Sequence, residues 1–269
     1  MRRKSVLGKK IEYRNKYSPD LLYAIPRKNN RRILGIGAEL PFHGEDVWNA
    51  YELTWLNAKD KPQVMTAEFR IPADSPNIIE SKSMKLYLNS LSMQQYQEPD
   101  FVTTAIIADL TQVAGAPVRV QLYPLAASGS ITELPGNCID DLDVECSSDD
   151  IDPGLLRCST DGTVFAELHS HLLRSHCPIT NQPDSGSILI RYKGRQIDRG
   201  SLLRYLVAYR NHHDFHESCV ERIFVDIKKQ IEPEQLTVYA RYNRRGGLDI
   251  NPFRSNYESA VPNLRLWRQ

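Results

Sequence analysis

The sequence predicts an α+β protein made of two similar modules, each with an antiparallel sheet and two helices layered on one face. Segments with strand and helix periodicity follow one another in the same order twice. Two strand segments stand side by side ahead of each helix pair, which favours antiparallel pairing. An acidic segment separates the two series, so we divide the chain into residues 1–125, 126–156 and 157–269.

The first module contains three strand segments and two helices. YELTWLN and PQVMTAEFRI have the composition of strands. A first helix and then a second are indicated by apolar residues at helical spacing: Met84, Tyr87, Leu88 and Leu91, followed by Val102, Ile106, Leu110 and Val113. A last strand is indicated by apolar residues at every second position: Val118, Val120 and Leu122.

The second module has the same order of elements. GTVFAELHSHLL and the alternating residues Ile188, Ile190 and Tyr192 predict two strands. GSLLRYLVAY predicts a helix, and a second helix follows from Val220, Ile223, Phe224 and Ile227. LTVYARY predicts a strand with Leu236, Val238 and Ala240 on one face, and a short final strand follows it.

The first helices of the two modules align directly. ESKSMKLYLNSL lies over DRGSLLRYLVAY, which pairs Ser83 with Ser201 and Tyr87 with Tyr205. Further along, IIADL lies over FVDI. The two modules therefore form an internal repeat.

Composition excludes several classes of protein. The 269 residues include 34 basic and 33 acidic side chains, so the net charge of +1 gives no overall attraction for nucleic acid. No run reaches the roughly 18 apolar residues of a membrane span, and the first ten residues lack the apolar stretch of a signal peptide. Five cysteines without a C-x-x-C pair argue against a disulfide framework and a zinc ribbon. We expect a cytoplasmic protein.

Charge is nevertheless uneven along the chain. Residues 1–32 hold eleven basic and two acidic side chains, whereas residues 126–156 hold eight acidic side chains and no basic ones. The basic arm could contact RNA or a phosphorylated ligand, or it could be a solvated extension. The motif G-x-G-x-x-G is absent, because the GIG at residues 35–37 is followed by AELP, so a dinucleotide-binding Rossmann fingerprint is excluded.

Cys177 is a candidate nucleophile in the turn-rich segment SHCPITNQPDSGS. Pro178 and Pro183 restrict this loop and could hold the thiol at a fixed geometry to Asp184. A thiol is only slightly ionised at neutral pH, so nucleophilic attack needs a nearby acid/base group such as Asp184 or His176. The spacing also allows an inert, half-buried cysteine.

The segment NHHDFHESC, residues 211–219, begins a predicted helix. Glu217 in the first turn could cap the helix, or its carboxylate could accept paired hydrogen bonds from the amidine edge of a guanine-like ring on which Phe215 stacks. Several histidines and a cysteine also lie close together in the sequence, which suggests a zinc site as an alternative. Its candidate ligands are His212, His213, His216, His176 and Cys177.

Two further motifs carry basic residues. In ESKSMKLY, Lys82 and Lys85 with the hydroxyls of Ser81 and Ser83 suit a phosphate at a helix start, or a solvated and capped face. In ARYNRRGGLDINPFRSN, the pair Arg244–Arg245 ahead of two glycines suits a phosphate monoester, or simply a turn.

Together, ESKSMKLY, CPITNQPD, FHE and RRGGLDINP resemble the motifs of one family. This family is the NADPH-dependent 7-cyano-7-deazaguanine reductases, the nitrile reductases of queuosine biosynthesis, in their long two-module form. The resemblance extends over nearly the whole chain and includes PFHGEDVWNAYELTWLN. It implies the tunnelling fold, which agrees with the repeat found above. It assigns no role to the first ten residues or to the acidic segment.

The resemblance also implies the site. The nitrile would be attacked by Cys177, with Asp184 giving and taking the proton and His216 beside it; two NADPH per turnover would reduce the thioimide, by way of an imine, to 7-aminomethyl-7-deazaguanine. The residues matching the family's substrate contacts are Ile79, Glu80, Ser81, Phe215, His216 and Glu217. The residues matching its cofactor contacts are Ser81, Lys82, Arg245 and Gly246. We expect no metal, no membrane, no direct nucleic-acid contact and a homodimer.

Two alternatives remain open at this point. The histidines and Cys177 could belong to a zinc-dependent cyclohydrolase of the same superfamily. The basic arm could instead make the chain a nucleic-acid-binding module.

Overall fold

The computed structural model describes residues 16–127, 129–146, 150–160 and 162–269. Two compact units form, and each gathers separate stretches of the chain: unit 1 takes Met1–Asn29, Asp46–Ser130 and Arg244–Asp249, and unit 2 takes Asn30–Glu45, Ile131–Asn243 and Ile250–Gln269. The basic residues between positions 2 and 14 lie outside the described residues. The division of the sequence at residues 125 and 157 stays a prediction.

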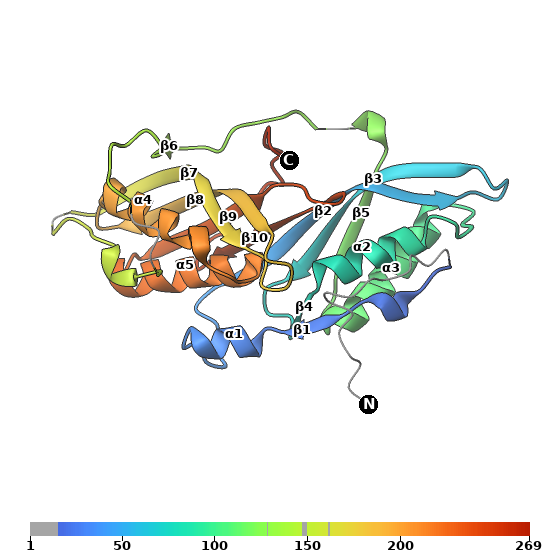
Figure 1. Cartoon of the computed structure of the whole chain (residues 1–269), viewed down its shortest axis with the longest axis horizontal. Helices are drawn as coiled ribbons and strands as arrows, with labels where there is room; N and C mark the ends of the chain where they lie inside the picture. Colours follow the sequence, from blue (N-terminus) through green and yellow to red (C-terminus); the bar gives the residue numbers. More distant parts are fainter. Residues whose placement is uncertain (1–15, 128, 147–149, 161) are drawn as a thin grey trace. The chain divides into compact units, whose positions relative to one another are not determined.

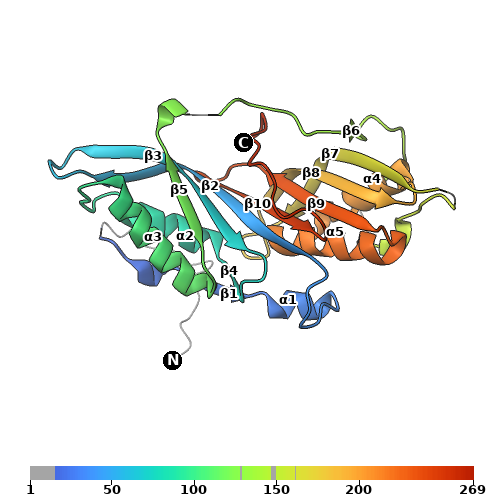
Figure 2. The same ribbon diagram turned by 180° about the vertical axis from the view of Figure 1, so that it is seen from behind.

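Unit 1 is a sheet covered by two helices. Its main strands are ordered β5-β3-β2, and β3 and β5 are antiparallel. A separate antiparallel ladder joins β1 to β4. Figures 1 and 2 show α2 and α3 together on one side of these strands. The elements are β1 (Ala24–Pro26), β2 (His43–Leu56), β3 (Pro62–Pro72), β4 (Asn77–Ile79), α2 (Ser81–Ser90), α3 (Pro99–Ala114) and β5 (Arg119–Tyr123), with 3₁₀ turns at Pro19–Leu21 and Leu125–Ala127.

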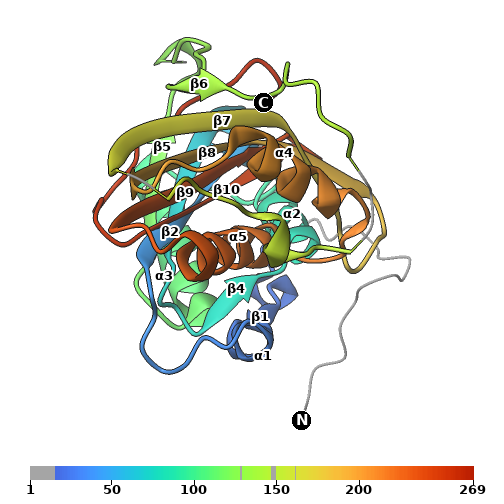
Figure 3. The same ribbon diagram turned by 90° about the vertical axis from the view of Figure 1, so that its left-hand side faces the viewer.

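Unit 2 repeats this plan with a wider sheet, ordered β10-β9-β8-β7-β6. Its long strands are antiparallel, whereas the two-residue strand β6 runs parallel to β7. Figure 3 shows α5 running beneath these strands. The elements are α1 (Lys28–Ile33), β6 (Asn137–Cys138), β7 (Val164–His176), β8 (Pro183–Gly194), α4 (Arg199–Val207), α5 (His216–Ile231), β9 (Gln235–Tyr242) and β10 (Leu248–Ser255), with 3₁₀ turns at Pro153–Leu155 and Ala208–Asn211.

The predicted α+β class is confirmed. The unit boundaries pass through β2 and β10, and α1 begins two residues before unit 2 does. Among the described residues, every helix is too short or too polar to cross a lipid bilayer.

The first helix of each unit starts in the same way. Glu80 caps α2 by accepting hydrogen bonds from the backbone N–H groups of Lys82 (2.9 Å) and Ser83 (2.7 Å). Asp198 caps α4 by accepting from the N–H of Ser201 at 2.7 Å. The Ser83 and Ser201 hydroxyls each donate back to the backbone carbonyl of the capping residue, at 2.7 and 2.8 Å. These local bonds satisfy the free N–H groups of the first turn.

The aligned tyrosines also make equivalent hydrogen bonds in both units. In α2, the Tyr87 hydroxyl donates to Asp109 of α3 at 2.6 Å; in α4, the Tyr205 hydroxyl donates to Asp226 of α5 at 2.7 Å. Burial is the main cause that raises the pKa of Tyr87, and the Asp109 carboxylate raises it further. Burial likewise raises the pKa of Tyr205. Both phenols therefore stay protonated and donate a charge-assisted hydrogen bond that joins the two helices of their unit.

The acidic segment is packed onto unit 2 along part of its length. Leu134 and Ile139 are buried, and Leu134 belongs to an apolar cluster with Leu189, Tyr239, Phe253, Val261 and Leu266.

At Gly44 the strand β2 approaches β10 so closely that a Cβ would stand 2.0 Å from the Phe253 carbonyl oxygen, so only glycine fits there.

We expect the two tyrosine–carboxylate bonds to differ in strength. Asp226 is buried, and burial raises its pKa, whereas Asp109 is half-buried and also accepts from Tyr17. Tyr205→Phe should therefore lower the free energy of unfolding by roughly 2–3 kcal/mol and Tyr87→Phe by about 1 kcal/mol, as measured by urea unfolding.

Tyr123→Phe is the matched control, because the Tyr123 hydroxyl makes no side-chain hydrogen bond within the described residues. Equal losses in all three variants would contradict a role for the carboxylates.

Candidate active site

Cys177 is the first residue of the hairpin loop that joins β7 to β8. Its backbone N–H donates to the Gln182 carbonyl at 2.9 Å, and its carbonyl accepts from the Asn181 N–H at 3.0 Å. Asn181 takes a left-handed φ of 56°, which an asparagine tolerates. The thiol is partly exposed, and all five cysteines of the chain are free thiols. The hairpin therefore presents Cys177 on a closed, hydrogen-bonded loop.

The segment ahead of α5 is bonded to the same hairpin. The N–H of His176 donates to the His212 carbonyl at 2.7 Å, and the N–H of Asp214 donates to the His176 carbonyl at 3.1 Å. The imidazole rings of His176 and His213 stack with their centroids 5.0 Å apart. These bonds hold the Cys177 loop beside the start of α5.

Asp184 and His216 form a pair. Asp184 lies on β8 directly opposite Ser175, the residue two positions before Cys177. Its Oδ2 stands 3.4 Å from the Nε2 of His216, the first residue of α5, and Asp184 is 5% exposed. The His216 ring stacks on Tyr242 with centroids 3.9 Å apart. A buried carboxylate and an imidazole in this geometry can store and move a proton.

Tyr242 itself stays neutral. It is fully buried on β9, and burial raises its pKa well above the ordinary value. Cys219 is also fully buried, and burial raises its pKa in turn, so this thiol stays protonated. Cys219 is thus chemically unlike the partly exposed Cys177.

Phe215 and Glu217 flank His216 at the beginning of α5. Phe215 is the N-cap residue and makes no side-chain capping hydrogen bond. Glu217 is 4% exposed although it lies in the first turn. A buried carboxylate at a helix N-terminus keeps its charge favourably, because the dipole of the helix supports it.

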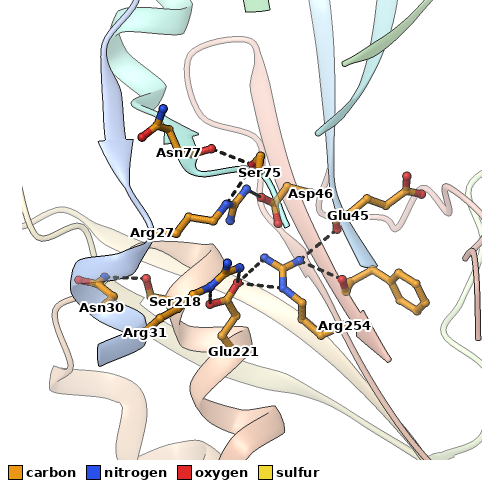
Figure 4. Close-up of polar contacts among 11 residues, drawn as sticks. Arg27, Asn30, Arg31, Glu45, Asp46, Ser75, Asn77, Ser218, Glu221 and Arg254 are labelled. Carbon is orange, nitrogen blue, oxygen red and sulfur yellow. Dashed lines mark hydrogen bonds and ion pairs between the residues drawn. The ribbon is translucent and has the colours of Figure 1, made fainter. Parts of the chain in front are cut away.

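A buried ionic cluster fixes this end of α5, as Figure 4 shows. Glu221 accepts from Arg31 at 2.7 and 2.9 Å and from Arg254 at 2.9 and 3.1 Å. The helix is also held by Asn30, which donates to Asp214 at 2.8 Å and to Ser218 at 2.7 Å. The segment carrying Phe215, His216 and Glu217 is therefore anchored on both of its sides.

In unit 1, two of the expected substrate residues have structural roles. Ile79 is 2% exposed in the β1–β4 ladder, where it pairs with Ala24. The Glu80 carboxylate is 4% exposed and accepts the two capping hydrogen bonds of α2. Ser81 is the first residue of α2 and is partly exposed.

The expected cofactor residues of unit 1 gather around the start of α2. Lys82 and Lys85 are partly exposed on this helix. A Cβ on Gly246 would lie 3.3 Å from the Lys85 side chain, so the turn after Arg245 rests against the helix. The guanidinium of Arg244 lies over the Tyr51 ring, 4.9 Å from its centroid.

The two glycines themselves have a turn role. Gly246 and Gly247 have φ of 58° and 78°, and Arg245 and Leu248 exchange backbone hydrogen bonds at 2.8 and 3.3 Å. Positive φ at both central residues is the conformation of a tight two-residue hairpin turn that glycine permits. The turn interpretation of RRGG is thus sufficient for the backbone.

Sequence reasoning missed Tyr242 and the ionic cluster. Tyr242 is the last residue of LTVYARY. Strand alternation puts it on the same face as Ala240, two positions earlier. The cluster joins α1, α5 and β10, and no local pattern signals such a contact. Among the described residues, the histidines around Cys177 do not bring three ligand atoms within 4.8 Å of one another. This geometry gives no support to a zinc site at Cys177.

The fold is α+β, and unit 2 carries the free thiol of Cys177 together with the Asp184–His216 pair, a set of groups typical of an enzyme with a cysteine nucleophile. Two family models match the chain: a nitrile reductase model, the N-terminal part of 7-cyano-7-deazaguanine reductase, at residues 13–122, and a QueF-like protein model at residues 183–260. The chain belongs to the 7-cyano-7-deazaguanine reductase family. The second range includes Asp184 and the start of α5, and Cys177 lies six residues ahead of it.

Relatives match the chain along almost its full length. The NADPH-dependent 7-cyano-7-deazaguanine reductase of Dechloromonas aromatica is 52% identical over 269 residues, covering 98% of this chain and 95% of its own. The protein of the same name from Hydrogenovibrio crunogenus is 50% identical over 268 residues, covering 99% and 97%. A crystal structure of the archaeosine synthase QueF-Like in the apo form matches with a TM-score of 0.32 and 18% identity, over 39% of this chain and 100% of that one.

Proposed function

We propose that this chain reduces the nitrile of 7-cyano-7-deazaguanine to the amine of 7-aminomethyl-7-deazaguanine with two molecules of NADPH, as a step of queuosine biosynthesis. The family and the names of its relatives support the substrate and the reductant. The observation that carries the mechanism is the Asp184–His216 pair, 3.4 Å apart, in the unit that also holds the Cys177 hairpin.

The first step is addition of the Cys177 thiolate to the nitrile carbon. A carbon–sulfur bond forms, one π bond of the nitrile opens, and the nitrogen takes a proton from Asp184 to give a covalent thioimide. The protonated thioimide accepts a hydride more readily than the nitrile does. His216, in contact with Asp184, holds that carboxyl in position and shares its proton.

NADPH, when bound, supplies the two hydrides of the reaction. After the first hydride reaches the thioimide carbon, the carbon–sulfur bond breaks, the Cys177 thiolate leaves, and an imine remains. A second hydride and a proton convert the imine to the amine. Holding the imine in a water-excluded site protects it from hydrolysis.

Base recognition falls to the start of α5. The Glu217 carboxylate would accept two hydrogen bonds from the amidine edge of the deazaguanine ring, and Phe215 would stack on its face. The position of Glu217 in the first turn of α5, two residues after the N-cap Phe215, supports this role because it puts the carboxylate and the ring on the same short segment. The family resemblance adds Ile79, Glu80 and Ser81 to the substrate contacts.

The residues around the start of α2 fit a phosphate-bearing cofactor. Lys82 and Lys85 lie near the helix N-terminus, and the Arg245–Gly246 turn rests on the same helix. Several cationic donors suit the doubly charged 2′-phosphate that separates NADPH from NADH. Ser81, Lys82, Arg245 and Gly246 are the cofactor residues of this proposal.

The proposal includes three further points. The reaction needs no metal, because Cys177 must be a free nucleophile. The enzyme works in the cytoplasm, a compartment suited to five free thiols, and it acts as a homodimer as the family resemblance implies. It handles a free base and contacts no nucleic acid directly.

The covalent step makes the sharpest prediction. Enzyme mixed with 7-cyano-7-deazaguanine without NADPH should gain the mass of one substrate per chain, because thiolate addition precedes hydride transfer. Cys177→Ala should abolish the adduct, and Asp184→Asn should slow its formation, since the nitrogen then lacks its proton source. Intact-mass spectrometry and peptide mapping measure both effects.

Cys158→Ala is the matched control, because Cys158 is also partly exposed and free. It should leave the adduct unchanged, and adduct formation and turnover should both persist in excess chelator. An adduct mapped to another cysteine, or turnover by Cys177→Ala, would refute the mechanism and leave the substrate assignment standing.

Cofactor preference tests the cationic group of unit 1. Arg245→Ala should raise the KM for NADPH at least tenfold and the KM for NADH much less, because only NADPH carries the 2′-phosphate. Arg195→Ala, which removes a partly exposed arginine of unit 2, should change neither KM. Equal effects of Arg245→Ala on both cofactors would rule out this role.

Glu217→Gln tests base recognition. The amide keeps the shape but points a donor at a ring N–H, so substrate binding to the NADPH-free enzyme should weaken by about 2 kcal/mol or more in calorimetry. Glu232→Gln, at the exposed end of α5, is the control and should bind as the parent does. Unchanged affinity of Glu217→Gln would assign Glu217 to helix stability instead.

A further inference from the structure

A cysteine and two histidines that have no role in the proposed reaction converge on unit 2. The Cys138 thiol and the imidazoles of His169 and His171 each bring one ligand atom within 4.8 Å of the other two. Among the described residues this is the one group of three such side chains. We propose that Cys138, His169 and His171 bind a single Zn²⁺-type divalent cation.

Strand pairing creates the convergence. Cys138 on β6 is the register partner of His169 on β7, so their side chains leave the sheet next to each other. His169 and His171 are two residues apart on β7, in a stretch where the pairing with β8 shifts register between Ser170 and Leu173. The rings lie with centroids 5.2 Å apart. Three ligands thus come from two adjacent strands.

The ring of His169 is set in the tautomer that binds metal. Its Nδ1 lies 3.0 Å from the Pro135 carbonyl oxygen, which can only accept a hydrogen bond. The proton of the neutral ring is therefore on Nδ1, and Nε2 carries the free electron pair. A backbone carbonyl that orients the other ring nitrogen is the usual support of a metal-binding histidine.

His171 has a similar support. Its Nδ1 lies 2.8 Å from the Ser187 hydroxyl, which also accepts from the Arg268 guanidinium at 3.0 Å. Nδ1 is thus occupied, and Nε2 is the nitrogen left for a ligand. Both imidazoles are oriented before any ion arrives.

The backbone that carries the three ligands is also fixed. The N–H of Ile139 donates to the His169 carbonyl at 3.0 Å. Asp140 accepts from the Ser170 hydroxyl at 2.6 Å and from the His171 N–H at 2.9 Å, so both carboxylate oxygens join the β6 segment to β7. Gly136 approaches Glu167 so closely that a Cβ would stand 2.4 Å from its carbonyl oxygen. Binding of a cation would therefore require little further ordering of this backbone.

The donor set selects the ion. One thiolate and two neutral imidazoles suit Zn²⁺ or Co²⁺ and suit Mg²⁺ and Ca²⁺ poorly. Metal–sulfur and metal–nitrogen bonds of about 2.3 and 2.0 Å require only a small closing of the three side chains, with water as the fourth ligand. Cys138 is exposed, so an ion can reach it. The expectation of no metal rests on Cys177 being a free nucleophile, and a cation held by Cys138, His169 and His171 leaves Cys177 free.

The bound ion would connect the acidic segment to the sheet. Because none of the three residues takes part in the proposed reaction, the site does not depend on the proposed function. Its effect is on the stability of the β6 segment and not on hydride transfer.

Metal titration of the full chain tests the site. Chain freed of metal by dialysis against a chelator should bind one Co²⁺, with the near-ultraviolet absorption of a thiolate–cobalt bond, and one Zn²⁺ should displace it. Cys138→Ser should abolish that absorption and weaken Zn²⁺ binding at least tenfold, and His169→Gln and His171→Gln should each weaken it similarly.

Two control variants separate this site from other thiols. Cys146→Ser removes another exposed cysteine of the acidic segment, and Cys177→Ala removes the proposed nucleophile; both should bind Co²⁺ as the parent does. Absence of stoichiometric binding would overturn the proposal, as would thiolate absorption that survives in Cys138→Ser or disappears in Cys177→Ala. Turnover should be retained in Cys138→Ser, so the outcome of the metal titration does not bear on the proposed function.

Discussion

The carboxylate of Glu221 is the contact on which the geometry of unit 2 depends. It lies one helical turn after Glu217 and receives two arginines, Arg31 from α1 and Arg254 from β10. All three side chains are nearly excluded from water, so removing the Glu221 carboxylate would leave two buried guanidiniums without it, at a cost of about 3–5 kcal/mol. Because Phe215, His216 and Glu217 lie on the turn just before it, this cluster fixes the position and rotation of the segment that carries the proposed base-recognition residues.

Most of the fold follows from local patterns, which is why the sequence predicted it. The strands at residues 43–56 and 164–176 and the helices at 81–90 and 216–231 carry their period in consecutive residues. The repeat was visible because the aligned serines and tyrosines make equivalent bonds: each serine closes a helix cap, and each tyrosine reaches a carboxylate on the next helix. An interaction that is local, or that recurs at a fixed spacing, leaves a trace in one sequence.

The parts of the candidate site that could not be predicted are those set by tertiary contacts. The stacking of His216 on Tyr242 joins residues on different elements, and the β6–β7 register that brings Cys138 to His169 spans about thirty residues. The Glu80 carboxylate caps α2, a bond that the motif did not predict, and its contact with substrate stays a prediction. Composition and spacing identify which groups are present, but the hydrogen bonds of each group decide what it remains free to do.

Comparison of equivalent positions explains why a duplicated fold would hold one reaction site. In unit 2 the hairpin between the paired strands carries Cys177, whereas the corresponding turn of unit 1 is a short Asn57–Lys61 loop in which Asn57 accepts from the Lys59 and Lys61 N–H groups. Conversely, Lys82 and Lys85 of α2 align with Gly200 and the buried Leu203 of α4. The exposed Asp100 begins α3 where the buried Glu217 begins α5. Each unit has the caps and tyrosine bonds that stabilise its helices, whereas the proposed site residues differ between them, so neither unit carries both the proposed nucleophile and the proposed cofactor-binding cations.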